Sequence, residues 1–143
     1  MKKLVMAAIA AVSMTAMSGE ELDALVSGTG PDVVASDVTS VRNAAFSDDR
    51  GVRKISLNSA TNVGSLAFRG CMALEEIELN ALVDTSRLPG AFAGCPKLVS
   101  ISLLSVSFDD GLKALGFPWG VTNAGAVFHF ANGDFDRNGN RIN

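Results

Sequence analysis

The sequence predicts a repeat solenoid, in which short coils of chain stack on one another and form a parallel β-sheet on one face. Two recurring patterns predict it. Ala-Phe pairs end at Phe46, Phe68 and Phe92, which are 22 and then 24 residues apart. Ile-x-Leu triplets begin at Ile55, Ile77 and Ile101 with the same spacing, and they alternate apolar and polar side chains as half-buried strands do. A unit of this length cannot close a core alone, so successive units must share one.

Residues 1–18 precede the repeats and are predicted to be a secretory signal peptide. Lys2 and Lys3 form its basic start, residues 4–12 form its apolar run, and the small residues Ala16 and Ser18 fit a cleavage site. The apolar run is about half of the ~20 residues that a spanning helix needs, so a membrane anchor is the disfavoured alternative. We therefore expect a secreted or cell-surface, extracytoplasmic protein with no transmembrane segment in the mature chain.

The charge balance argues against nucleic acid as a partner. The chain has 12 Lys and Arg residues against 15 Asp and Glu, a formal net charge of −3. Removal of Lys2 and Lys3 with the signal peptide would make it −5. An acidic chain with scattered bases repels a phosphate backbone.

The rest of the chain divides into repeats with a cap at each end. Caps are expected because the ends of a solenoid expose apolar strand edges. Residues 19–32 are predicted to form a short helical cap, in which Gly28 ends the helix. Residues 33–107 carry the repeats of about 22–24 residues, and residues 108–143 leave the repeat pattern as an irregular C-terminal cap with a polar tail.

The C-terminal cap contains three local signals. Residues 109–116 are predicted to hold one helical turn, and residues 126–130 are the last strand candidate. Asn132-Gly133 is a tight-turn signal that would fold Phe135 back as a β-hairpin.

The links between repeats carry the most specific motif. Ala-Phe-x-Gly-Cys-x-x-Leu-x-x-Ile-x-Leu occurs twice, and its segments 68–71 and 92–95 are the most distinctive. The pattern resembles the BspA-type leucine-rich repeat of bacterial secreted and surface proteins, over about residues 33–103. The first unit departs from it, with Asp49 in place of the Cys. The resemblance implies a curved solenoid used for non-catalytic binding, commonly in adhesion.

The repeated positions define the predicted core. Cys71 and Cys95 occupy equivalent places in successive coils, where the ~4.8 Å strand spacing would allow a disulfide. Two buried thiols that pack as small hydrophobes are the favoured alternative. The predicted structural core is Phe46, Ile55, Leu57, Phe68, Cys71, Leu74, Ile77, Leu79, Phe92, Cys95, Leu98, Ile101 and Leu103.

Outward positions of the strands are the candidate binding face. Lys54 and Glu76 are expected to be lateral neighbours that form an ion pair. Trp119 is a candidate anchor for a protein or a sugar, with a cap residue over the last coil as the favoured alternative. For the strand positions the alternative is a solvated sheet face. The candidate partner-binding residues are Lys54, Ser56, Glu76, Glu78, Ser102 and Trp119.

Oxygen-bearing residues near the C-terminus give a weak calcium signal. Asp134, Asp136 and Asn138 alternate like the start of a calcium loop, with Gly139 sixth. The twelfth position, where a bidentate Glu belongs, lies beyond Asn143, so a polar turn is the favoured alternative.

No catalytic constellation emerges from the spacing of the residues. His129, the single histidine, is expected to face outward or to be structural. We therefore expect no enzyme and no cofactor. The predicted function is a secreted, non-catalytic leucine-rich repeat module that binds a protein or glycan through its strand face, in adhesion. The alternative is a self-associating subunit of an envelope or extracellular assembly.

Overall fold

A computed structural model describes residues 32–34 and 38–142. The predicted signal peptide and, apart from Asp32, the predicted N-terminal helical cap lie outside the described residues.

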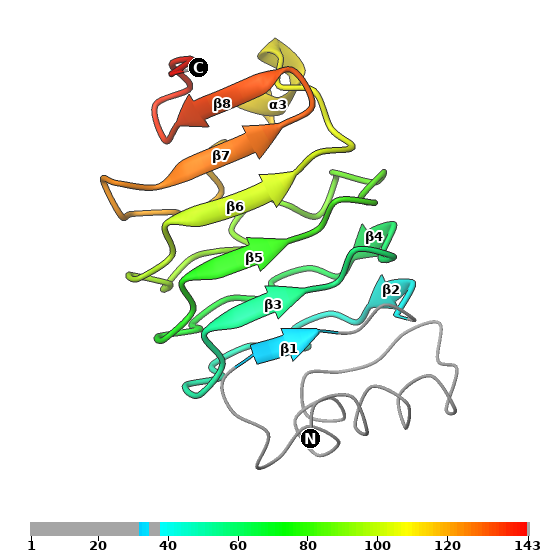
Figure 1. The fold of residues 1–143 in the computed structure, drawn as a ribbon. Coiled ribbons are helices and arrows are strands. Elements are labelled where there is room, and N and C mark those ends of the chain that lie inside the picture. The colour runs from blue at the N-terminus through cyan, green and yellow to red at the C-terminus, as the bar shows by residue number, and fades with distance from the viewer. Residues whose placement is uncertain (1–31, 35–37, 143) are drawn as a thin grey trace.

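One six-stranded sheet forms the front of the molecule (Figure 1). Its spatial order is β1-β3-β5-β6-β7-β8. The first five strands run parallel, and β8 pairs antiparallel with β7. The strands are β1 (Asp32–Val34), β3 (Lys54–Ser56), β5 (Glu76–Glu78), β6 (Ser100–Leu103), β7 (Val127–Phe130) and β8 (Gly133–Asp136).

The register of this sheet follows the repeat. Ile55 pairs with Ile77, and Ile77 pairs with Ile101. The same row begins at Val33 and continues through Phe128 to Phe135. All six side chains are buried, so the row is one continuous stripe of core along the inner face of the sheet. The predicted solenoid with a parallel sheet on one face is confirmed.

In each of the first coils, the chain passes through the main sheet and then through a second, smaller sheet. It pairs β2 (Ser40–Val41) with β4 (Asn62–Val63) in parallel, and an isolated bridge joins Asn62 to Asp84 in the next coil (Figure 1). The pairing buries Val41 and Val63, which are 3% and 2% exposed. The sequence analysis did not predict strands here.

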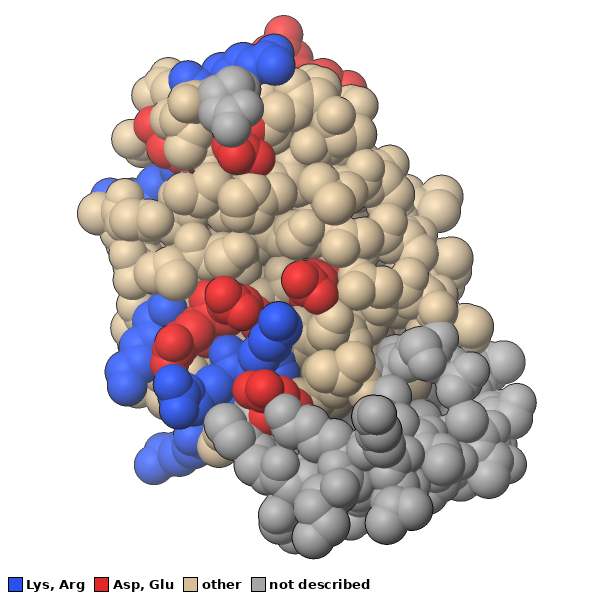
Figure 2. Space-filling view, in the orientation of Figure 1, with Lys and Arg blue, Asp and Glu red and all other residues tan. Residues whose placement is uncertain are grey.

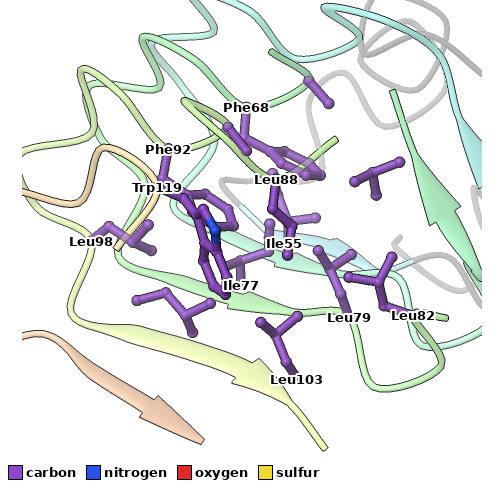
Figure 3. Close-up of a cluster of buried hydrophobic side chains, with 14 of the residues drawn as sticks. Ile55, Phe68, Ile77, Leu79, Leu82, Leu88, Phe92, Leu98, Leu103 and Trp119 are labelled. Carbon is purple, nitrogen blue, oxygen red and sulfur yellow. The ribbon is translucent and has the colours of Figure 1, made fainter. Parts of the chain in front are cut away.

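The wall opposite the main sheet is built from the Ala-Phe pairs. The rings of Phe46, Phe68 and Phe92 stack at centroid distances of 5.7 and 6.0 Å. Figure 3 shows Phe68 and Phe92 lying across the core from the isoleucines of the strands. The residues two positions before each Phe have positive φ (Ala44, Leu66 and Gly90), which turns the chain back toward the core. All thirteen residues of the predicted structural core are buried.

The last coil differs from the prediction that the repeat pattern ends before residue 108. Residues after 107 were expected to leave the repeat, but β7 adds to the parallel sheet, with Ile101 paired to Phe128. The coil is longer than the others and contains the helix α3 (Asp110–Ala114), which begins after the N-cap Asp109. The predicted hairpin is confirmed, with a two-residue loop at Ala131-Asn132, one residue before the predicted Asn132-Gly133 turn, because Gly133 is already the first residue of β8.

The C-terminal residues cover the outer edge of β8. Ile142 donates its backbone N–H to the carbonyl oxygen of Asp134 at 2.8 Å, and Phe135 forms an antiparallel bridge with Arg141. The backbone N–H of Asp136 donates to the carbonyl oxygen of Asn140 at 2.9 Å. The chain thus supplies its own neighbour for the edge of the sheet, which would otherwise be open to another strand.

Candidate binding face

The outward face of the main sheet carries two rows of side chains, each set by the strand register. One row follows the first position of each parallel strand and ends at the last residue of β8: Asp32, Lys54, Glu76, Ser100, Val127 and Asp136. The other lies two positions later along the parallel strands: Val34, Ser56, Glu78, Ser102, His129 and Asp134. The structure therefore places the predicted strand-face residues side by side.

Charge is concentrated at one end of this face. Figure 2 shows acidic and basic side chains gathered over β1, β3 and β5, and an uncharged expanse over β6 and β7. Lys54 Nζ lies 3.6 Å from Glu76 Oε2, which confirms the predicted cross-strand pair, and Arg53 Nε lies 3.1 Å from Glu75 Oε2. Both pairs are well exposed, so each contributes at most about 1 kcal/mol to folding. Their main effect is to set the charge pattern that a partner meets.

Ser56 is a correction to the predicted contact residues. Its side chain was expected to be exposed, but the residue is only 7% exposed. Its hydroxyl donates to Glu78 Oε1 at 2.5 Å, and Asn58 Nδ2 donates to the Ser56 oxygen at 3.1 Å. The hydrogen bond from Ser56, followed by that from Asn58, lowers the pKa of the Glu78 carboxyl. Ser56 therefore positions an ionised Glu78 on the face rather than meeting a partner itself.

Trp119 is also unavailable to a partner on the surface. It is 0% exposed and packs edge-on against Phe117 and Phe128, at centroid distances of 5.1 and 5.9 Å. Its carbonyl oxygen accepts the backbone N–H of Phe92 at 3.0 Å, and Figure 3 shows the indole beside that residue. Within the described residues, its Nε1 has no hydrogen-bond partner. Trp119 covers the preceding coil, as in the favoured alternative.

One row of polar residues was missed by the sequence analysis. Ser102, His129 and Asp134 are lateral neighbours on β6, β7 and β8. His129 Nδ1 lies 2.8 Å from Asp134 Oδ1. The Ser102 hydroxyl, however, donates to Asn80 Oδ1 at 2.7 Å, on the side away from β7. A nucleophile would need to donate toward the imidazole, so this geometry is that of a hydrogen-bonded surface row.

The predicted calcium ligands take part in a turn. Asp136 Oδ1 accepts the backbone N–H groups of Asn138 and Asn140, both at 2.9 Å, while Asp134 faces His129. The N–H groups, that of Asn140 first, lower the pKa of the Asp136 carboxyl. Among residues 32–34 and 38–142, no three His, Cys, Asp or Glu side chains gather closely enough to hold a metal ion. The calcium site stays a prediction, and the contacts are those of a polar turn.

The two cysteines are free thiols in the core. Cys71 Sγ donates to the carbonyl oxygen of Phe46 at 3.1 Å. Cys95 Sγ makes the same contact with Phe68 at 3.0 Å. Each thiol therefore satisfies a buried carbonyl group of the preceding coil, and the alternative of a disulfide is not realised.

These features define a leucine-rich repeat solenoid, and comparison with known proteins gives its family. The family model described as "BspA type Leucine rich repeat region (6 copies)" matches residues 33–110, more than half of the chain. The chain belongs to the BspA-type leucine-rich repeat family. No curated protein and no solved structure gives a significant match.

Membership of this family supports a coarse function. Its repeats are typically non-catalytic binding scaffolds, which suggests a protein-interaction module, and its members are usually extracellular or on the cell surface. In the part of the chain that the structure describes, no helix has the length and apolar character needed to span a membrane.

Proposed function

We propose that this protein is secreted and binds a protein or glycan partner, in adhesion, through the outward face of its main sheet. The observation that carries the proposal is the change in charge along this face. Lys54, Glu76 and the positioned Glu78 lie at one end, and Ser100, Ser102 and Val127 form an uncharged centre. A partner with a polar or basic group beside a hydroxyl-rich or apolar group would complement this pattern.

The size of the face favours weak, multivalent binding. Six strands at ~4.8 Å spacing make a strip about 24 Å wide, and strands of three or four residues are about 10–13 Å long. The strip covers roughly 300 Å², well below the ~800 Å² that each partner contributes to a standard interface. A single copy should therefore bind weakly, and many copies on one surface should bind with avidity.

The experiment is a screen of the mature chain, displayed in many copies on beads, against glycans and extracellular matrix proteins. Hits are repeated with Lys54→Glu, which reverses a charge on the strand face. Lys97→Glu makes the same charge change at an exposed position in the link before β6 and is the matched control. We expect loss of binding with Lys54→Glu only. Equal loss with both variants, or with neither, would contradict a strand-face site.

The alternative of end-to-end self-association receives less support. Such a contact would need open sheet edges at both ends of the solenoid. Residues 140–142 already pair with the outer edge of β8, so within the described residues this strand edge is not open to a second copy.

A further inference from the structure

Backbone hydrogen bonds join successive coils in two ladders, one along the main sheet and a second along the smaller sheet. The second ladder stops one coil before the ladder of the main sheet. Thr39 O accepts the N–H of Thr61 at 2.9 Å, and Thr61 O accepts that of Val83 at 2.8 Å. In the main sheet, the equivalent ladder continues through Val99 O to the N–H of Val127, at 2.9 Å. Val83 O, by contrast, accepts no hydrogen bond from another described residue. An open backbone acceptor therefore ends the second ladder.

The fourth coil, which begins at β6, does not continue the second ladder because the C-terminal cap holds its chain away from the third coil. By repeat spacing, Ser107 would supply the next rung above Val83. Its neighbour Phe108 donates its backbone N–H to Asn132 Oδ1 at 2.9 Å and accepts Asn132 Nδ2 at 3.0 Å. The Phe108 ring packs with Phe117 and Phe135, at centroid distances of 4.7 and 4.6 Å. These contacts fix the chain against the hairpin instead of the third coil.

A groove of about 540 Å³ opens where the rung is missing. Leu82 and Leu112 form its buried floor, and Val106 and Leu115 line its side. Val83 stands at its rim and is 76% exposed, the highest value among the large hydrophobic side chains of the described residues. The groove therefore offers apolar contacts directly beside the open backbone edge.

The charge at the groove selects its occupant. Asp109 lines the groove, and no Lys or Arg of the described residues lines it. Asp84 follows Val83 but lines a neighbouring pocket, together with Arg42 and Arg87. Thr85, Ser105 and Ser107 add hydroxyl groups. An extended segment with alternating apolar and basic side chains would place the apolar ones on the floor and a basic one beside the Asp109 carboxylate.

We propose that this groove binds an extended, basic and apolar segment of another polypeptide, which adds as one more parallel strand beside residues 83–85. The site goes beyond the strand-face proposal, since it lies on the wall of the second sheet and uses different residues. Backbone N–H groups of the segment bond to Val83 O, and its apolar side chains cover Val83 and Val106.

The probe is a fluorescein-labelled ten-residue peptide of alternating valine and lysine, measured by anisotropy against the full mature chain. Two peptides serve as controls: one with glutamate in place of lysine, and one with every backbone nitrogen methylated, which keeps the charge but removes all backbone donors. We expect both controls to bind at least about tenfold more weakly. Equal binding of the N-methylated peptide would overturn strand addition.

Variants of the protein locate the site. Val83→Arg should raise the Kd for the valine-lysine peptide at least about tenfold. Met72→Arg changes another exposed hydrophobic residue, 49% exposed, and should leave the Kd unchanged, as should Lys54→Glu on the strand face. An unchanged Kd with Val83→Arg, or an equal loss with Met72→Arg, would overturn the proposal. So would a dimer in light scattering that Val83→Arg dissociates, because the occupant would then be a second copy. Failure here leaves the strand-face proposal standing, since Lys54→Glu tests that face separately.

Discussion

The thiol of Cys95 donates a hydrogen bond to the carbonyl oxygen of Phe68, one coil away, at 3.0 Å. Cys71 and Phe46 repeat the relationship one coil earlier. In each case the Phe wall turns its carbonyl group into the core, where water cannot reach it, and the next coil supplies a small side chain with a donor. The cysteine of this repeat is thus a hydrogen-bonding residue as well as a packing one.

The first prediction concerns the chemistry of these thiols. The neighbouring Cys95 thiol, together with burial, raises the pKa of the Cys71 thiol, while Cys71 lowers the pKa of Cys95, so the proton that the folded state retains is that of Cys71. A thiol in the unfolded chain ionises near pH ~8.5, so above that pH unfolding releases a proton that the folded state retains. The free energy of unfolding should therefore fall as pH rises, by up to about 1.4 kcal/mol per pH unit. Denaturant unfolding at pH 7, 9 and 10 measures the slope.

Cys71→Ala is the control for this slope. The variant should be less stable at pH 7, by about 1–2 kcal/mol for the lost hydrogen bond and packing, but its stability should depend less on pH above ~8.5. A slope identical to that of the unchanged protein would show that other groups cause it. Both thiols should also resist iodoacetamide until the chain unfolds.

Gly64 should tolerate no side chain. Its backbone N–H donates to Val41 O at 2.7 Å, which brings the second coil against the first. A Cβ at this position would meet the backbone of Asn43 and Arg42, which cannot swing aside as a side chain would. We expect Gly64→Ala to destabilise the fold by about 1–3 kcal/mol in denaturant unfolding. Gly51→Ala is the control, because its Cβ would meet nothing closer than 3.8 Å; similar losses in both variants would refute the steric argument.

Asn80 should stabilise the stacking of three coils. Its Oδ1 accepts the backbone N–H of Leu104 at 3.1 Å and the Ser102 hydroxyl at 2.7 Å, while its own N–H donates to Asn58 Oδ1 at 3.1 Å. Asn80→Ala removes the acceptor and should cost about 1–2 kcal/mol of unfolding free energy. Asn138→Ala, which changes an exposed asparagine in the C-terminal turn, is the control. Its midpoint of denaturant unfolding should move little. Equal shifts of the two unfolding midpoints would show that the hydrogen bonds of Asn80 add no particular stability to the stack of coils.

The C-terminal covering of β8 should loosen in acid. Backbone N–H groups, that of Asn140 first, lower the pKa of the Asp136 carboxyl in the folded state. The stabilisation is therefore complete above the carboxyl's unfolded pKa and is lost as pH falls through the lower folded pKa. Amide exchange followed by NMR, with each rate compared to that of the unfolded chain at the same pH, should show Asn138, Asn140 and Ile142 losing protection at acidic pH before the core amides do. Asp136→Asn should show fast exchange of these amides already at neutral pH, and slow exchange there would contradict the assignment.

Much of the fold was predictable because the repeat fixes the register. Once Ile55, Ile77 and Ile101 are aligned, the pairing of the strands and the Lys54–Glu76 contact follow from the alternation of side chains. The hairpin was predictable from a local signal, the Asn132-Gly133 dipeptide, although its loop residues are Ala131 and Asn132 and Gly133 is the first residue of β8. These are properties of short segments.

The missed features depend on the length and contents of particular coils. β7 extends the parallel sheet, although its coil contains α3 and puts Phe128 where β3, β5 and β6 have Ile. That longer coil separates Ser102 from His129, so their proximity on the face could not be predicted from spacing. Burial of Ser56 and Trp119 depends on contacts with Glu78 and with the aromatic cluster, and the repeat pattern contains neither. The end of the second ladder depends on Asn132, which is 24 residues from Phe108.

Partners across the parallel sheet are 22, 24 or 27 residues apart, and each strand bonds only to the coils on either side. A chain connected in this way can gain or lose one whole coil while the remaining strands keep their pairing register. Deletion of residues 56–77 would join Ile55 to Glu78 and give Lys54-Ile55-Glu78-Leu79, which still reads Ile-x-Leu. The coil with Phe108, Trp119 and Asn132 has no such freedom, since its side chains fit one another and no other coil. Such a protein can lengthen or shorten its outward sheet face by whole coils while its C-terminal coil stays the same.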